Sequence, residues 1–288
     1  MIALRSKTAL VTGVADNVGF GWHIAKILQA AGANVILSCH PRVRSMLERF
    51  LTKDKYQESR LLPFNKGTFT PAAVISCDVG IDTAQALPAE LLSQKGYENN
   101  NVSIQDLIEQ TGEISASLDI LIHSVAFSPE VTKSHLEVSR GAYLTAMSVS
   151  SYSLIALTRA ALPLMQNRQA SIVGLSYLAS ERAVPFYGGG MASAKAALEC
   201  DARSLSWFVG EMGHRMNIIS AGPYASRAAK SIGDIETMID ATAARSPLRR
   251  SISPQDVANA ALFLCSDLST AITGEVLHVD AGYHVMGV

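Results

Sequence analysis

The chain has 288 residues, a formal net charge of −1 at pH 7 and a hydrophobic content of 48%. This balance, without a block of Lys or Arg, argues against a nucleic-acid surface, because such surfaces bind by neutralising phosphates. The four cysteines form no Cys-x-x-Cys pair, which argues against a disulfide framework and a zinc site. No apolar run approaches the roughly 20 residues that cross a bilayer. We therefore expect no nucleic-acid partner, no membrane and no metal.

Short apolar runs alternate with segments that have the apolar spacing of helices. The runs predicted as strands are Thr8–Thr12, Gly32–Ser38, Ala72–Cys77, Leu118–His123, Ala170–Leu175, Arg215–Ser220 and Gly274–Val279. Helices are predicted over Trp22–Ala31, Leu136–Met165, Met191–Trp207 and Pro254–Cys265. Two polar segments, 43–70 and 80–117, are expected as excursions around the carboxyl edge of the sheet. The alternation predicts one α/β domain over residues 1–288, a doubly wound parallel sheet of about seven strands with helices on both faces.

A glycine-rich turn, Gly13-Val14-Ala-Asp-Asn-Val-Gly19-Phe20-Gly21, follows the first predicted strand. Glycines let the backbone approach a pyrophosphate, and the following helix offers free N–H groups and a partial positive charge. The spacing differs from Gly-x-Gly-x-x-Gly, and glycine-rich turns also occur for structural reasons. The turn alone is compatible with either interpretation, but its place between a strand and a helix favours a dinucleotide site of Rossmann type.

The ends of the second and third predicted strands bear on cofactor choice. Dinucleotide folds usually place an acid after the second strand to hold the adenosine ribose, and here the chain reads Cys-His40-Pro-Arg42. Arg42 and Arg44 could bind a 2′-phosphate or could be solvated, and we favour the solvated interpretation. Asp78, after the third strand, could accept a hydrogen bond from an adenine amine, although an Asp that caps the next turn is a close alternative.

Two phenols and one amine lie in or after the fifth strand. Tyr177 leaves the carboxyl end of the strand, Tyr187 precedes three glycines, and Lys195 falls in the first turns of the next helix. A nearby cation lowers the pKa of a phenol, which can then donate a short hydrogen bond or a proton to a developing oxyanion. We therefore expect Lys195 to lower the pKa of Tyr187 in a shared cleft. The alternative is that both tyrosines are packing residues and the lysine is solvated.

Two further segments allow more than one interpretation. His123 lies on an apolar strand, where a hydrogen-bonded core histidine is favoured over a catalytic base. Residues 225–244 contain an amphipathic piece, Ile232–Met238, which is typical of a mobile lid over an apolar substrate, and equally of an ordinary surface helix. The apolar tail Tyr283–Val288 is expected to be packed, either within this chain or against another subunit.

Taken together, these motifs resemble those of a known family. Thr12-Gly13, Cys77-Asp78-Val79, Ser220-Ala-Gly-Pro223 and Val279-Asp-Ala-Gly282 are similar to the short-chain dehydrogenase/reductase family. More narrowly, Tyr177-Leu-Ala-Ser-Glu-Arg182, Tyr187-Gly-Gly-Gly-Met-Ala-Ser-Ala-Lys195 and the ending Met286-Gly-Val288 resemble the NADH-dependent enoyl-acyl-carrier-protein reductases of type II fatty-acid synthesis, especially the plastid form. Ordinary short-chain reductases place the Lys four residues after the Tyr, where this chain has Met191. In the family, that departure accompanies reduction of a conjugated carbon–carbon double bond.

The resemblance implies reduction of the trans-2 double bond of enoyl-acyl-carrier-protein thioesters by hydride from NADH, the last reductive step of fatty-acid elongation. It implies that Tyr187 bonds the thioester carbonyl oxygen, that Lys195 binds the nicotinamide ribose and that Tyr177 supports the site. The implied cofactor-binding residues are Gly13, Val14, Gly19, Phe20, Asp78, Val79, Ser124, Val125, Ala126, Lys195, Pro223, Tyr224 and Ser226. The implied substrate-binding residues are Ala126, Tyr177, Tyr187, Met191 and Ala228.

The same resemblance implies a homotetramer, an acyl carrier protein as partner, and a bacterial-type cytoplasm or, after removal of a transit peptide, a plastid stroma. His40 departs from the plastid enzymes, which carry a Trp there, and this leaves the choice between NADH and NADPH open. Two alternatives remain: a short-chain carbonyl (3-oxoacyl) reductase of the same fold, and a nucleotide-binding sensor without catalysis. The intact Tyr187 and Lys195 pair argues against the sensor.

Overall fold

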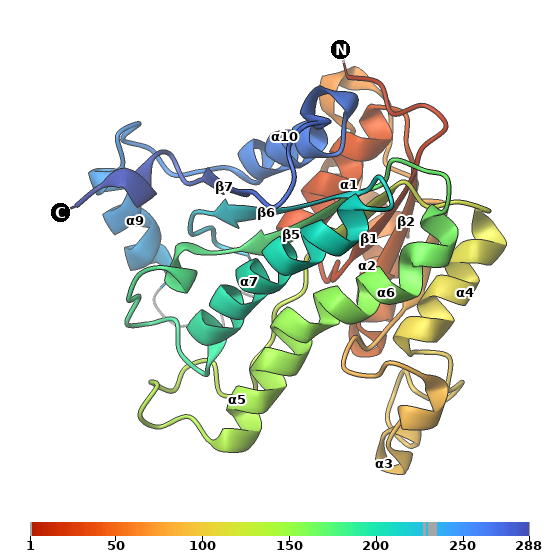
Figure 1. The fold of residues 1–288 in the computed structure, drawn as a ribbon, viewed down its shortest axis with the longest axis horizontal. Helices are drawn as coiled ribbons and strands as arrows, with labels where there is room; N and C mark the ends of the chain where they lie inside the picture. Colours follow the sequence, from red (N-terminus) through yellow and green to blue (C-terminus); the bar gives the residue numbers. More distant parts are fainter. Residues whose placement is uncertain (1, 227–228, 230–234, 288) are drawn as a thin grey trace.

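The computed structural model describes residues 2–226, 229 and 235–287. In this part of the chain, seven parallel strands form one sheet in the order β3-β2-β1-β4-β5-β6-β7 (Figure 1). The strands are β1 (Thr8–Thr12), β2 (Asn34–Cys39), β3 (Ala73–Ser76), β4 (Ile120–His123), β5 (Ser171–Ser176), β6 (Arg215–Ala221) and β7 (Val276–Val279). All seven predicted strands are present, each within two residues of its predicted ends, which confirms the doubly wound parallel sheet.

Helices cover both faces of the sheet, as predicted. They are α1 (Phe20–Ala30), α2 (Arg44–Thr52), α3 (Ala89–Leu92), α4 (Ile104–Ile114), α5 (Arg140–Met147), α6 (Ser153–Met165), α7 (Met191–Gly210), α9 (Ile235–Arg245) and α10 (Pro254–Leu264). Along the strands, alternate side chains enter two separate apolar layers. One layer packs under α1 and α10, and the other under α4, α6 and α7, which cross the front of the sheet in Figure 1. Because both faces are buried, the strands have the near-continuous apolar sequences typical of parallel sheets.

The two polar excursions contain helices that the sequence analysis did not predict. Residues 44–52 form α2, and residues 104–114 form α4, which packs against α6. A capping box starts α4: Ser103 Oγ accepts from the Asp106 N–H at 3.1 Å, and Asp106 accepts from the Ser103 N–H at 2.9 Å. The Ser-x-x-Asp spacing before an apolar run is a helix-start signal. The sequence analysis missed this signal because the surrounding segment, 80–117, is polar overall.

The helical prediction over 136–165 is correct except for its start and for one distortion. Ser139 caps α5 through the Ala142 N–H, so the helix starts at Arg140. Residues Ser148–Tyr152 then form a π-helical turn before α6. Such turns often occur at functional sites. Here Ser150 Oγ accepts from the Phe127 N–H at 2.9 Å and donates to the Phe127 carbonyl oxygen at 3.1 Å. The distorted turn therefore fixes the loop that follows β4.

His123 is the buried core histidine that was expected. Its Nε2 lies 2.7 Å from Ser153 Oγ, which donates its own proton to the Val149 carbonyl oxygen at 2.7 Å. The hydroxyl has one proton, so Nε2 carries the hydrogen that Ser153 accepts. Burial, and next the proximity of Lys195, lower the pKa of His123 to about 3. The imidazole is therefore neutral at pH 7 and serves to tie β4 to α6.

Candidate active site

The predicted site residues come together at the carboxyl edge of the sheet. Strand order reverses between β1 and β4, the point at which α/β sheets bind ligands. The glycine turn leaves β1, Ser124 leaves β4, Tyr177 leaves β5 and Tyr224 follows β6. One edge therefore carries the glycine turn, the two phenols and the lysine.

The glycine turn is pressed against the segment after β4. Gly13 has φ of +73°, and a Cβ there would overlap the Ser124 carbonyl oxygen. A Cβ on Gly21 would lie 3.2 Å from Ser124 Oγ. Asp16 Oδ1 accepts from the Val18 N–H at 3.0 Å and the Gly19 N–H at 2.7 Å, which holds the turn in shape. Glycine is therefore required by close approach, the condition under which a backbone can also approach a phosphate.

The start of α1 suits a pyrophosphate. No side chain caps this 11-residue helix at Gly19, so N–H groups of its first turn remain open to an anion. Val14, which is buried, donates its N–H to the Ser38 carbonyl oxygen at 3.0 Å and joins the turn to β2. The donors present fit the phosphates of a dinucleotide.

The loop after β6 meets the same turn. The rings of Phe20 and Tyr224 lie 5.4 Å apart between centroids. The Ser226 N–H donates to the Tyr224 carbonyl oxygen at 2.7 Å, and Ser226 Oγ accepts from the Ala229 N–H at 3.1 Å. Pro223 is half-buried beside them. Phe20 from the glycine turn thus meets the loop that carries three further predicted cofactor residues, Pro223, Tyr224 and Ser226, whereas Ala228 lies outside the described residues.

The segment after β4 passes between this turn and the phenols. Val125 packs against the apolar layer under α6, while Ala126 is exposed toward the edge. Met191, the first residue of α7, is buried, and its sulfur lies 3.6 Å from Ser150 Oγ. The same π-helical serine therefore contacts both the loop after β4 and a predicted substrate residue. Ser150 was not predicted, because a serine inside a helical pattern gives no functional signal.

Tyr177 and Tyr187 form an edge-to-face pair with ring centroids 5.1 Å apart. Tyr187 is only 8% exposed and packs with Met191 in a small apolar cluster. Burial, and next the proximity of Tyr177, raise the pKa of the Tyr187 phenol well above 10. Burial likewise raises the pKa of Tyr177 to about 12. The prediction that a cation lowers the pKa of Tyr187 is therefore wrong, because desolvation decides the direction. Both phenols are neutral hydrogen-bond donors at pH 7.

Lys195 is buried one turn into α7 and is directed at the β5 backbone. Its Nζ donates to the Leu175 carbonyl oxygen at 2.7 Å. Burial lowers the pKa of Lys195, and the nearby Glu199 partly offsets this effect, so that the pKa is about 8. Glu199 is itself buried and accepts a hydrogen bond from Ser176 at the end of β5. The ammonium thus stays mostly charged at pH 7 within a site built from β5 and α7.

The three glycines between Tyr187 and α7 are needed for close packing. A Cβ on Gly188 would overlap the Lys133 carbonyl oxygen, and one on Gly190 would lie 2.8 Å from the Tyr143 ring. Gly189 and Gly190 also have positive φ, +61° and +79°. Ser128 Oγ donates to the Gly189 carbonyl oxygen at 2.7 Å. The loop therefore lies flat against residues 128–133, and this packing buries Tyr187.

Asp78 is both a turn cap and part of a larger cluster. Its Oδ1 accepts from the Gly80 N–H at 3.0 Å, as the capping alternative predicted. Its Oδ2 accepts from the Tyr97 hydroxyl at 2.7 Å, and His40 Nε2 lies 3.6 Å away. Val79 is buried beside it. Tyr97 was missed because nothing in the sequence of a long polar excursion indicates that it folds back to this edge.

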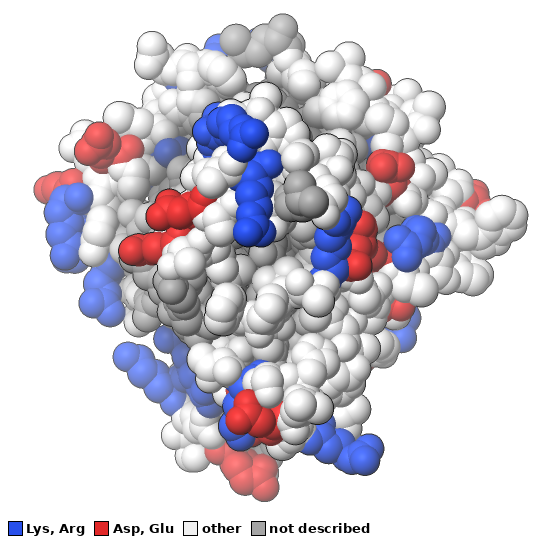
Figure 2. Space-filling model, turned by 90° about the vertical axis from the view of Figure 1, so that its left-hand side faces the viewer, with Lys and Arg blue, Asp and Glu red and all other residues white. Residues whose placement is uncertain are grey.

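Charged side chains give no large patch on the face shown in Figure 2. Lys and Arg are interspersed there with Asp, Glu and uncharged residues. None of the described helices is long and apolar enough to cross a membrane.

The fold and the site together define a dinucleotide-dependent oxidoreductase of the short-chain dehydrogenase/reductase type. Residues 70–284 match the sequence model of the family described as Enoyl-(Acyl carrier protein) reductase. The chain is 44% identical to the chloroplastic NADH enoyl-acyl-carrier-protein reductase of Arabidopsis thaliana, over 100% of this chain and 74% of that protein. It is 38% identical to the corresponding Nostoc enzyme over the full length of both.

Solved structures agree with the sequence matches. The Plasmodium berghei enoyl-acyl-carrier-protein reductase with triclosan is 37% identical and has a TM-score of 0.93, covering 98% of this chain and 99% of that one. The Anaplasma phagocytophilum reductase in complex with NAD is 34% identical with a TM-score of 0.79, covering 99% and 96%. The chain belongs to the enoyl-acyl-carrier-protein reductase family.

The lowered pKa of Lys195 predicts a pH-dependent stability. Between about pH 8 and the ordinary lysine value of 10.5, the unfolded chain holds a proton that the folded chain has lost, so the free energy of unfolding rises with pH. From pH 8 to pH 10 this contribution amounts to about 2 kcal/mol. Denaturant titrations give the free energy of unfolding of wild type and of Lys195→Met. The difference between these two free energies should change by about 2 kcal/mol between pH 8 and pH 10. The exposed Lys53→Met variant is the control, and a difference independent of pH for Lys195→Met would contradict the assignment.

Proposed function

We propose that the protein reduces the trans-2 double bond of an enoyl thioester on an acyl carrier protein, with NADH as the reductant. The observation that carries this proposal is the buried, neutral Tyr187 phenol beside Tyr177, at the same carboxyl edge of the sheet as the glycine turn. The family to which the chain belongs supports the same reaction. Relatives named as NADH-dependent support the choice of cofactor.

NADH supplies the hydride that adds to the β-carbon of the substrate. The turn from Gly13 to Phe20 and the start of α1 would hold its pyrophosphate, because the turn allows close backbone approach and no side chain caps the helix start. Asp78 and Val79 would meet the adenine side. The nicotinamide side would lie among the predicted residues nearer the phenols, namely Ser124, Val125, Ala126, Lys195, Pro223, Tyr224 and Ser226.

The protein's main chemical contribution is a donor for a developing negative charge. When the β-carbon gains hydride, electrons move to the thioester carbonyl oxygen and form an enolate, which then takes a proton at the α-carbon. Tyr187 would donate its hydrogen bond to that oxygen, and burial strengthens the interaction because water is excluded. The Lys195 ammonium keeps a positive charge beside the site, and Tyr177 supports the ring of Tyr187 from its edge. Met191 and Ala126 would border the acyl chain.

Residues 225–244 are proposed as the lid over this site. Ile235–Arg245 is helical as α9, with Ile235 buried, while residues 227–228 and 230–234, including Ala228, lie outside the described residues. The tail forms a turn at Tyr283–Val285, and the Arg182 guanidinium donates to the carbonyl oxygens of His284 and Met286 at 2.7 and 3.1 Å. Chloroplastic and bacterial relatives support a cytoplasmic or plastid location.

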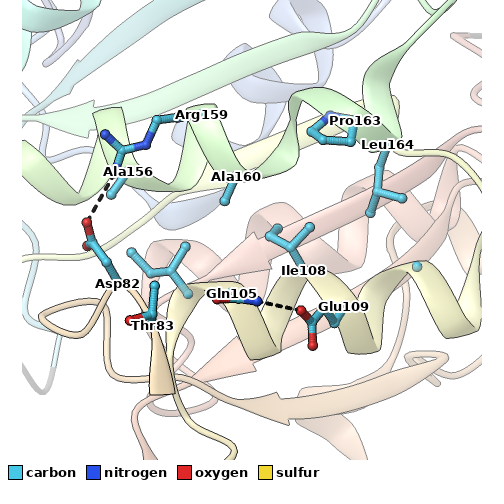
Figure 3. Close-up of a pocket in the computed structure, with 12 residues that line it drawn as sticks. Asp82, Thr83, Gln105, Ile108, Glu109, Ala156, Arg159, Ala160, Pro163 and Leu164 are labelled. Carbon is cyan, nitrogen blue, oxygen red and sulfur yellow. Dashed lines mark hydrogen bonds and ion pairs between the residues drawn. The ribbon is translucent and has the colours of Figure 1, made fainter. Parts of the chain in front are cut away.

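A homotetramer is proposed as the working assembly. Trp207, Phe208 and Met212 near the end of α7 are 71%, 58% and 55% exposed, an amount of apolar surface that usually marks an interface. A second feature is a cavity of about 520 Å³ between α4 and α6. Figure 3 shows apolar side chains of both helices lining it, with the Asp82–Arg159 ion pair at one end. It contains none of the predicted site residues. Both features lie on the helical face opposite α1 and α10, which a second copy could cover.

Replacing Tyr187 tests the function directly. The Tyr187→Phe variant should lower kcat with an enoyl thioester by about 100-fold or more, since one donor to a developing oxyanion is lost, while the KM for NADH stays near the wild-type value. Steady-state assays with enoyl-acyl carrier protein, against NADH and NADPH separately, measure both. Tyr56→Phe is the control, because the Tyr56 ring packs edge-to-face with Phe50. Two results would refute the proposal: an unchanged kcat in Tyr187→Phe, or a wild-type enzyme that turns over a 3-oxoacyl thioester faster than the enoyl thioester.

Replacing exposed aromatic residues tests the assembly. The double variant Trp207→Lys and Phe208→Lys should lower the mass in solution from four copies to two or one, because charges would be buried in the interface. Light scattering after size-exclusion chromatography measures it. The control is Leu61→Lys, because Leu61 is also exposed but lies in the polar segment 43–70, away from α7. A wild-type protein of monomer mass would overturn the proposed assembly.

A further inference from the structure

A chain of hydrogen bonds joins the ends of β2 and β3 through Tyr97. The Arg42 N–H donates to His40 Nδ1 at 3.3 Å, His40 Nε2 lies 3.0 Å from the Tyr97 hydroxyl, and this hydroxyl donates to Asp78 Oδ2 at 2.7 Å. The hydroxyl has one proton, which it gives to Asp78, so it accepts from the Nε2–H of His40. Because Nδ1 accepts the Arg42 N–H, the imidazole is the Nε2–H tautomer. Each member of the chain therefore has a defined direction.

The excursion between β3 and α4 is fixed firmly enough to hold this geometry. Tyr97 is 1% exposed and packs with Ile81 and Val102 in a small core of its own. Gly96 has φ of +96°, and a Cβ there would lie 2.8 Å from the Pro41 carbonyl group. The backbone beside Tyr97 is thus in contact with the turn after β2. A side chain from a long polar segment is held at the cofactor edge by packing on both sides.

The cluster presents a negative charge at this edge. Burial raises the pKa of Asp78, but the adjacent His40 and the hydrogen bonds from Tyr97 and the Gly80 N–H more than offset it and bring the pKa down to about 2. The carboxylate is therefore ionised throughout the physiological range. The side chains of His40 and Asp78 are 42% and 19% exposed, so the charge is accessible to a ligand at the sheet edge.

The two cations that could bind a 2′-phosphate are already paired. The Arg42 guanidinium bonds to the Gln94 side chain and lies 6.0 Å from the centre of the Tyr97 ring. Arg44 bonds to Glu48 at 2.9 Å along α2. Releasing either arginine for a phosphate would break an existing contact. This arrangement favours the solvated, non-ligand interpretation of both residues.

We propose that Tyr97 is a positioning residue for cofactor selection: it holds Asp78 and His40 at the adenosine end of the site, which then accepts a free ribose 2′-hydroxyl and rejects a 2′-phosphate. A dinucleotide fold places the adenosine ribose at the end of the second strand, where His40 stands. A phosphate brought there would meet the fixed Asp78 carboxylate and like-charge repulsion. This proposal takes one premise from the proposed function, namely that the cofactor is a nicotinamide dinucleotide.

Binding of NADH and NADPH to the purified full chain, followed by nucleotide fluorescence, tests this selection without turnover. Wild type should bind NADH at least tenfold more tightly than NADPH. Tyr97→Phe keeps the packed ring but loses the donor to a charged group, so it should weaken NADH binding about tenfold and raise the KM for NADH more than it changes kcat. Of the variants, Asp78→Asn should bring the affinities for NADH and NADPH closest together, because the charge that repels the 2′-phosphate is gone. Tyr56→Phe is the matched control.

Two results would overturn the proposal: equal wild-type affinity for the two nucleotides, or unchanged affinities in a folded Tyr97→Phe protein. If Tyr97→Phe does not unfold cooperatively, His40→Ala takes its place, since His40 is more exposed and its loss removes the donor to Tyr97. If His40→Ala had the same ratio of NADH affinity to NADPH affinity as wild type, that result would also overturn the proposal. A wild-type protein that binds NADH selectively but reduces no enoyl thioester would contradict the proposed function alone.

Discussion

Desolvation of one phenol is the constraint on which the site depends. Tyr187 is buried because the glycine loop after it lies flat on residues 128–133, and because Tyr177 covers the edge of its ring. In that environment the hydroxyl keeps its proton and can donate a hydrogen bond. A neutral donor in a water-poor site is suited to an oxygen that gains charge during the reaction, more than to a carbonyl that already carries it.

The fold supplies the rest of the site through parallel strands that end at one edge. The turn after β1 contacts the segment after β4 through Gly13 and Ser124, and reaches the loop after β6 through Phe20 and Tyr224. The π-helical turn before α6 then fixes the loop after β4 through Ser150. The contacts of Gly13 with Ser124 and of Phe20 with Tyr224 join segments that are more than 100 residues apart in the chain, so the cofactor edge and the phenols are positioned by one framework.

The sequence predicted the sheet because both faces of each strand are buried, which leaves a strong apolar signal. It also predicted which residues share the carboxyl edge, since parallel strands must all end there. It gave the wrong direction for the pKa of Tyr187, because residue spacing reveals a nearby cation but not the degree of burial. It missed α4, whose capping signal at Ser103 lies in a polar segment. It also missed Tyr97, since its role depends on a tertiary contact between Gly96 and Pro41 that no local pattern encodes.

The claim most exposed to test is that burial keeps Tyr187 protonated. A spectrophotometric pH titration of phenolate absorbance, taken as the difference between wild type and the Tyr187→Phe variant, follows this one group. The account predicts that its phenolate forms only above pH 10, later than an ordinary tyrosine. A phenol that ionises below pH 9 would show that a neighbouring cation controls Tyr187, and would contradict the account.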